Sequence, residues 1–436
     1  MRDPRLLSIT LMSLIVSALG LARPTAHTAL AAERAAPRMT YGQARDFLVK
    51  YTKVIELTNE DGGRVAICPE YQGRVMTSTC EGFDGQSLGW INRAFIERGE
   101  NNTHFNNYGG EDRFWLAPEG GQYSLWFAPG AKQTLANWLT PSDLNEGAFQ
   151  VTSDDKSPFY GLARKMHLSN ATGTQFTVDV SREIHILSAL NFGELFGQEA
   201  KSAVTAGALK LVGFKSVNTI TNRGAPMTKE KGLFSIWSLG MFPPGPRTKI
   251  IIPYKPGSEP EMGPVVKSDY FGDVPASRLR VTDDAIWFTG DGQFRSKIGV
   301  SQHRVKPVAG SIDPDAGILT LVHFTMPDDP TAYAYLNNGW ELPQRQPYVG
   351  DVINSYNDGP PEPGKPSLGG FYELESLSPG AQLPTGKSLS HVHSTFHIQG
   401  SLPALVQVAK AALGINIPGP AQAPLVRGKN DEARTQ

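Results

Sequence analysis

The sequence has only two cysteines, and it lacks a large excess of charge of either sign. Two thiols make a poor metal site, and the spacing of Cys68 and Cys80 matches no metal-binding motif. We therefore expect no metal, and we also expect no cofactor. With 41 basic and 42 acidic residues the formal net charge is −1 at pH 7, so no broad basic surface favours nucleic acid as a partner. Function must be sought in a local site.

The first residues carry a targeting pattern. Arg2 and Arg5 precede an apolar run over 6–22, and small residues at 29–31 offer a cleavage site. No cysteine directly follows the run, which argues against a bacterial lipoprotein. We expect a signal peptide over 1–31 and a periplasmic or secreted bacterial protein with no stable membrane insertion after cleavage. The alternative is a transmembrane anchor, but several serine and threonine residues interrupt the run.

Export would place both cysteines in an oxidising compartment. Cys68 and Cys80 flank the segment 71–73, which reads as a turn between two strands, so the two thiols could lie close enough to bridge. A disulfide and a pair of free thiols are both compatible with the sequence.

Short segments with alternating apolar and polar residues dominate the chain, and Gly, Asn or Asp separate them. They lie at 54–57, 64–67, 74–78, 149–152, 175–180, 216–222, 248–254, 279–282, 285–289, 318–325, 371–377 and 389–398. Helical patterns occur near 40–51, 198–209 and 402–413. Many short strands with few helices predict a mainly β fold, a large antiparallel β-supersandwich with a few short helices.

No internal repeat is found, and no linker divides the chain. The Pro-rich stretch 360–366 is short and reads as a surface loop. We therefore expect one domain over 32–417, followed by a disordered tail over 418–436 that lacks apolar periodicity.

The C-terminal part carries the most informative order of motifs. Leu374-Glu375-Ser376 lies on a predicted strand, and a Leu-Pro-Thr-Gly-Lys turn at 383–387 and an alternating strand follow. This order resembles the galactose-mutarotase-like (aldose epimerase-like) superfamily, in which Leu-Glu-Thr is followed by Leu-x-Pro-Gly-Glu. Segments 57–75, 108–119 and 218–237 are similar to its opening hairpin, its Gly-Gly segment and its aromatic strand. The resemblance implies the supersandwich fold, a carbohydrate ligand and Glu375 as catalytic base.

One departure from that pattern concerns the proton donor. In true aldose epimerases the aromatic strand carries a histidine, whereas the matching run 234–239 here has none. The sequence therefore resembles an uncharacterised branch. Glu375 could serve ordinary mutarotation, a different reaction, or sugar binding alone.

Glu373 and Glu375 are the first candidates for catalysis. They lie two apart on a predicted strand, so both side chains fall on one face. Mutual repulsion raises one pKa and can place a protonated acid beside an ionised base, as epimerase or glycosidase chemistry requires. The alternative is two exposed carboxylates on an edge strand. His185 is a further candidate for the missing acid.

The segment after Gly109-Gly110 joins charge to aromatic surface. Glu111, Arg113 and Trp115 suit a saccharide, which offers hydroxyls to charged partners and an apolar face to a ring. Alternatively, Arg113 pairs with Asp112 or Glu119, and Trp115 belongs to the core.

Two further strands add polar residues at alternate positions. Asn354 and Tyr356 share a strand face near the start of the loop to Glu373, and Arg295 and Lys297 share another. We predict that all four bind substrate. The paired cations need an anionic partner, which could be Glu375, Glu373 or an acidic sugar. The alternatives are turn structure for the first pair and a solvated basic face for the second.

His391, His393 and His397 all fall on one face of the last strand. We place His391 and His393 among the substrate-binding residues, while a metal site or packed imidazoles are alternatives. The sequence thus predicts an exported carbohydrate-binding protein, a sugar epimerase or glycan-cleaving enzyme with Glu375 as general base. A noncatalytic glycan-binding protein is the alternative, and the oligomeric state is not predicted.

Overall fold

Three antiparallel sheets make up the computed structural model, which describes residues 38–154 and 157–415. The expected signal peptide over 1–31 and tail over 418–436 lie outside the described residues. The predicted mainly β fold with a few short helices is confirmed.

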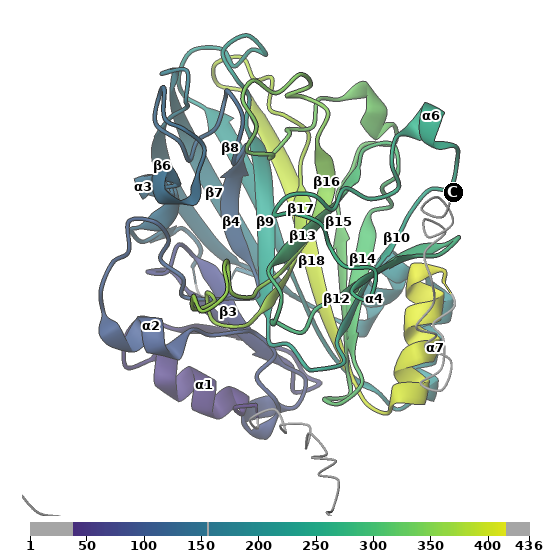
Figure 1. Ribbon diagram of the computed structural model, residues 1–436. Coiled ribbons are helices and arrows are strands. Elements are labelled where there is room, and N and C mark those ends of the chain that lie inside the picture. Colours follow the sequence, from purple (N-terminus) through teal and green to yellow (C-terminus); the bar gives the residue numbers. More distant parts are fainter. Residues whose placement is uncertain (1–37, 155–156, 416–436) are drawn as a thin grey trace, which may run out of the picture. The chain divides into compact units, whose positions relative to one another are not determined.

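The largest sheet has ten strands and is antiparallel throughout. In spatial order its strands are β11 (Leu279–Val281), β12 (Ala285–Thr289), β10 (Lys249–Pro253), β14 (Val308–Asp313), β15 (Ile318–Phe324), β18 (Ser388–Gln399), β8 (Lys210–Asn222), β7 (Gln175–Leu187), β6 (Tyr160–Ser169) and β5 (Gln150–Val151). The C-terminal strand β18 lies in the middle, between β15 and β8 (Figure 1).

Two smaller sheets accompany it. The five-stranded sheet has the order β13 (Ser296–Ser301), β16 (Asp351–Asn357), β17 (Tyr372–Leu377), β9 (Ser235–Phe242) and β4 (Arg113–Ala117). The three-stranded sheet consists of β1 (Ile55–Thr58), β2 (Arg64–Cys68) and β3 (Arg74–Thr79). The turn between β2 and β3 holds Gln72 and Gly73 at φ 56° and 63°, a region that glycine enters without strain.

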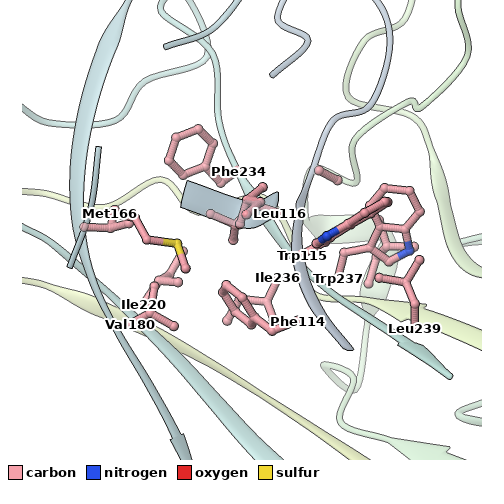
Figure 2. Close-up of a cluster of buried hydrophobic side chains, with 14 of the residues drawn as sticks. Phe114, Trp115, Leu116, Met166, Val180, Ile220, Phe234, Ile236, Trp237 and Leu239 are labelled. Carbon is pink, nitrogen blue, oxygen red and sulfur yellow. The ribbon is translucent and has the colours of Figure 1, made fainter. Parts of the chain in front are cut away.

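The five-stranded sheet packs through one face on the ten-stranded sheet. Phe114 of β4 and Ile236 of β9 belong to a buried cluster with Met166, Val180 and Ile220 of β6, β7 and β8 (Figure 2). Full burial of such a side chain contributes about 1.5–3 kcal/mol, so this apolar layer fixes where the smaller sheet lies. Because side chains alternate along a strand, every second residue of β4, β9 and β17 points to the other face.

Helices cover the outer face of the ten-stranded sheet. Phe192 and Phe196 of α4 (Ala189–Phe196) and Leu405 and Val408 of α7 (Leu402–Leu413) share a buried cluster with Phe396 of β18. Helix α7 has its buried residues at helical spacing and ends at Gly414, which adopts the left-handed conformation. The remaining helices are α1 (Tyr41–Leu48), α2 (Arg93–Arg98), α3 (Ser142–Asn145), α5 (Gln198–Ala206) and α6 (Glu259–Met262), with 3-10 turns at Gly82–Asp84, Leu135–Asn137 and Pro330–Ala332.

The helices and the two cysteines can be compared with the expectations from sequence. No helix within the described ranges is both long and apolar enough to span a membrane. Cys68 and Cys80 are both buried free thiols. Of the two alternatives that the sequence left open, the structure therefore has the free thiols and not the disulfide.

Candidate functional site

The face of the five-stranded sheet that points away from the ten-stranded sheet gathers most of the predicted site residues, whose side chains there are buried. Residues paired across antiparallel strands share a face, and the register aligns Arg113, Leu239, Glu375, Asn354 and Gly299 in one row. We call this the site face.

Neighbouring rows complete the site face. Lys297 of β13 pairs with Tyr356 of β16, and Trp115 of β4 pairs with Trp237 of β9. Glu373 lies two residues from Glu375 on β17 and therefore shares its face, as the sequence predicted. Trp115 and Trp237 lie on the other side of their strands from Phe114 and Ile236 (Figure 2).

Glu375 is fully buried and held through one oxygen. Its Oε2 accepts hydrogen bonds from Trp237 Nε1 at 2.9 Å and from Lys297 Nζ at 3.0 Å. Its Oε1 has no hydrogen-bond partner among the described residues. Burial alone would lower the pKa of Lys297, but nearby carboxylates, foremost that of Glu375, hold it above its usual value. The ammonium group is therefore charged at neutral pH.

Glu373 forms a second buried ion pair. Arg113 Nη2 donates to Glu373 Oε1 at 3.1 Å, and both side chains are less than a tenth exposed. Burial raises the pKa of Glu373 to about 7, with the Arg113 guanidinium opposing and the Glu375 carboxylate adding to the shift. Near neutral pH this carboxyl group exists in both protonation states.

Four tryptophans lie beside these pairs, each in ring contact with Trp115, Trp126 or both, and we call them the tryptophan cluster: Trp115, Trp126, Trp138 and Trp237. Their ring centroids are 5.3 to 6.5 Å apart, and the Arg113 guanidinium lies 3.9 Å from the Trp115 centroid. The buried indole N–H groups of Trp115 and Trp126 have no acceptor within the described segments. Apolar rings beside charged groups suit a sugar, which has both kinds of surface.

A third carboxylate reaches the same cluster. Trp138 Nε1 donates to Glu119 Oε1 at 2.9 Å, and burial raises the pKa of Glu119. From the sequence, Glu119 was expected only as a possible ion-pair partner of Arg113. A signal existed, since Glu119 follows β4 with a single Pro118 between.

The other edge of the site face carries Asn354, Tyr356 and Arg295. Asn354 Nδ2 donates to the hydroxyl of Tyr270 at 3.2 Å, and the Tyr356 hydroxyl donates to Asp358 at 3.1 Å. The Arg295 guanidinium lies over the Phe271 ring at 3.6 Å from its centroid. Only Lys297 of the predicted cation pair bonds to Glu375.

The structure places His391 and His393 behind the site face. Both imidazoles contact Ser376 Oγ at 2.8 Å, and Ser376 points to the opposite side of β17 from Glu375. Burial lowers the pKa of His391 to about 3 and that of His393 to about 4, so both are neutral. They lie between the two sheets because β18 belongs to the ten-stranded sheet.

Glu111 and His185 also lie away from the site face. Glu111 accepts from Ser78 Oγ at 2.9 Å and contacts His397 Nε2 at 3.0 Å, with all three residues buried. His185 of β7 contacts Glu183 at 3.3 Å and is half-buried on the outer side of its sheet. Within 38–154 and 157–415 no group of three His, Cys, Asp or Glu side chains is arranged to hold a metal ion.

The pattern of one protein family matches residues 39–422, which is most of the chain. The chain belongs to DUF6786, a family of unknown function. Comparison of this DUF6786 protein with curated proteins gives no match.

Two solved structures are similar to the DUF6786 chain. A candidate aldose 1-epimerase from Escherichia coli K12 has 12% identity and a TM-score of 0.46, with 80% of this chain and 100% of that chain covered. The Slr1438 protein from Synechocystis sp. PCC 6803 has 14% identity and a TM-score of 0.43, with 80% and 96% covered.

Behind the site of the DUF6786 chain lies a buried polar layer. Arg182 of β7 donates to Asp112 Oδ1 at 2.8 Å and to Asn218 Oδ1 at 2.7 Å, and Asn218 Nδ2 reaches Ser238 Oγ at 3.2 Å. Asp112 directly precedes Arg113, so this layer ties β4 and β9 to the ten-stranded sheet. Sequence reasoning missed it because the partners lie on different sheets.

Proposed function

We propose that the protein binds a carbohydrate on the site face and acts on it with Glu375 as general base. The observation that carries this proposal is the asymmetric environment of the Glu375 carboxylate. Oε2 is fixed by Trp237 and Lys297, whereas Oε1 has no partner in the described part of the chain. A fixed carboxylate with one free oxygen can accept the proton of a substrate hydroxyl. The reactions that fit are epimerisation at or next to an anomeric carbon and cleavage of a glycan.

The charges of the site favour a neutral sugar. Arg113 and Lys297 are already paired with Glu373 and Glu375, and Arg295 lies on an aromatic ring. Both cations that bond the site carboxylates are thus neutralised and do not require an acidic group on the ligand. Trp138, the ring of the tryptophan cluster that is partly exposed, offers a stacking surface for a C–H face, and the Arg113 guanidinium with the unpaired indole N–H groups offers donors that suit hydroxyls.

Sugar ring opening and glycoside cleavage also need a proton donor. Two carboxyl groups beside Glu375 have a raised pKa and are candidates for this donor: Glu373, whose pKa burial raises to about 7, and Glu119. Lys297 and Arg113 would stabilise negative charge that develops on substrate oxygens. The donor role would replace the histidine that the strand 234–239 lacks.

The test is a panel of neutral aldoses and oligosaccharides, assayed for anomer exchange by NMR and for release of reducing ends. We expect Glu375→Gln to lower kcat by about 10²–10⁴-fold on any accepted sugar, with the circular dichroism spectrum unchanged. Exposed Glu97→Gln on α2 is the matched control and should behave as wild type. Wild-type turnover in Glu375→Gln would refute the assignment of the base.

Noncatalytic glycan binding is the second candidate, and the absence of a histidine in β9 favours it. In that case Glu375→Gln should change only the affinity measured by calorimetry. No sugar of the panel would be converted by the wild type.

A further inference from the structure

Glu119 is held rigidly at the edge of the site face. Its backbone N–H donates to Asn338 Oδ1 at 2.8 Å, and its carbonyl accepts from the Ser124 hydroxyl. Its side chain accepts from Trp138 Nε1 at 2.9 Å. Three hydrogen bonds thus fix both the main chain and the carboxyl group.

The tryptophan cluster joins Glu119 to Glu375. Trp138 bonds to Glu119 and Trp237 bonds to Glu375, and both indoles contact the rings of Trp115. Each of the two carboxyl groups therefore accepts a hydrogen bond from an indole N–H of the same cluster. The charge of Glu119 also acts on Lys297, the residue that bonds Glu375.

We infer that Glu119 is a catalytic acid of this site, which protonates the substrate oxygen that leaves carbon while Glu375 removes the hydroxyl proton. This inference rests on the proposed function. In aldose ring opening, the anomeric O1–H proton passes to Glu375 Oε1, and the electron pair of the O1–H bond forms the second bond of the C1=O1 carbonyl. The C1–O5 bond breaks, its electron pair stays on O5, and O5 takes the proton of Glu119. Ring closure returns both protons, so no further reactant is needed.

The hydrogen bonds favour Glu119 over Glu373 for this role. Glu373 bonds directly to the Arg113 guanidinium, which stabilises the ionised form. The side chain of Glu119 bonds instead to a neutral indole N–H, which favours the ionised form less than a directly bonded guanidinium does. Glu119 also keeps partial exposure, through which a proton can be exchanged with solvent between turnovers.

The charged groups around Glu119 set its titration. Burial raises its pKa, and the Glu375 carboxylate acts in the same direction. The Lys297 cation, the hydrogen bond from Trp138 and the Arg295 cation oppose this shift, and Arg113 also lies within electrostatic range. The net direction is upward, so a larger fraction is protonated near neutral pH than for an exposed carboxyl.

The first test needs no substrate. In protein labelled with ¹⁵N-tryptophan, Trp138→Phe identifies the Trp138 indole resonance, which should titrate with a midpoint above the ordinary glutamate value of about 4.3. This titration should vanish in Glu119→Gln. A Trp138 resonance that is flat, or that titrates equally in Glu119→Gln, would overturn the inference.

The second test uses a sugar that the wild type converts. We expect Glu119→Gln to lower kcat by about 10²–10⁴-fold and to remove the alkaline limb of the pH profile, because a general acid must be protonated. Glu119→Asp should retain that limb, and exposed Glu97→Gln should match wild type. If Glu373→Gln removes the limb and Glu119→Gln keeps wild-type kcat, the inference is wrong. If the wild type converts no sugar, the proposed function fails, and the Trp138 titration separately decides whether Glu119 carries the proton.

Discussion

Lys297 is the residue on which the charge balance of the site depends. Its ammonium group bonds Glu375 and feels the charges of Glu119 and Glu373, which together hold its pKa above the usual value despite burial. Without this cation, Glu375 would keep only the Trp237 indole as a hydrogen-bond donor. A buried carboxylate with a single neutral donor is costly in free energy.

We therefore predict that Lys297→Met lowers the free energy of unfolding by about 3–5 kcal/mol at pH 7, as measured in urea. The double variant Lys297→Met/Glu375→Gln should recover part of this loss, because it removes the unpaired charge. Equal stability of the single and double variants would show that the pair is not coupled.

His391 and His393 predict a pH dependence of stability. Burial lowers their pKa values to about 3 and about 4, so the folded chain keeps both neutral, whereas the unfolded chain protonates them below about pH 6.5. The unfolded state then binds more protons, and stability falls as the pH drops from about 6.5 towards 4, by up to about 1.4 kcal/mol per unit for each histidine.

Urea titrations at pH 7 and pH 5 measure this effect. His393→Asn should be less stable than wild type at pH 7 but should show a smaller loss between the two pH values. Exposed His167→Gln is the control and should keep the wild-type difference. An unchanged difference in His393→Asn would contradict the prediction.

At the residue scale, alternation along a strand predicted more than composition did. It correctly placed Glu373 with Glu375 and Asn354 with Tyr356, because side chains of a strand have a period of two. It could not place Glu119, which lies beyond the end of a strand and meets its partner Trp138 only through the fold.

The buried layer between β4 and β7 acts at the scale of whole elements. The ion pair between Arg182 and Asp112 is fully excluded from solvent and joins the strand that carries Arg113 to the ten-stranded sheet. Its loss should therefore disturb both stability and the position of β4 in the site.

We predict that Arg182→Met lowers the free energy of unfolding in urea by about 3–5 kcal/mol, because it leaves the Asp112 carboxylate buried without a cation. Arg182→Met/Asp112→Asn should cost less than the single change. Exposed Arg223→Met directly after β8, where the pair with Asp179 is solvated, should cost at most about 1 kcal/mol. A similar cost for both arginines would refute the special role of the buried pair.

Elements were predictable where their apolar pattern is regular. Strands β17 and β18 follow the expected segments, whereas β7 and β8 extend well beyond the expected 175–180 and 216–222. Strand β6 was missed because Arg164 interrupts its apolar series and instead bonds Asp143. The pattern also says which residues share a face, but not which sheet a strand joins. For this reason β17 and β18, close in sequence, were expected in one site although they lie in different sheets.

At the scale of the whole molecule, we propose export and predict a mature N-terminus near Ala32. The basis is the pair of arginines before an apolar run and the small residues at 29–31. Intact-mass spectrometry of the protein from a periplasmic fraction measures this directly. An uncleaved Met1 in that fraction would contradict the prediction, and a variant with Ala31→Arg should accumulate uncleaved.

The position of β18 in the ten-stranded sheet has a consequence for the order of folding. This strand, 388–399, is hydrogen-bonded on one side to β15 and on the other to β8, which precedes it by more than a hundred residues (Figure 1). Until the ribosome has released residue 399, the sheet can exist only as two separate halves with open edges. Such long-range pairing is slow and leaves exposed edges prone to aggregation. Both halves therefore keep an unpaired edge until their last strand, β18, joins them.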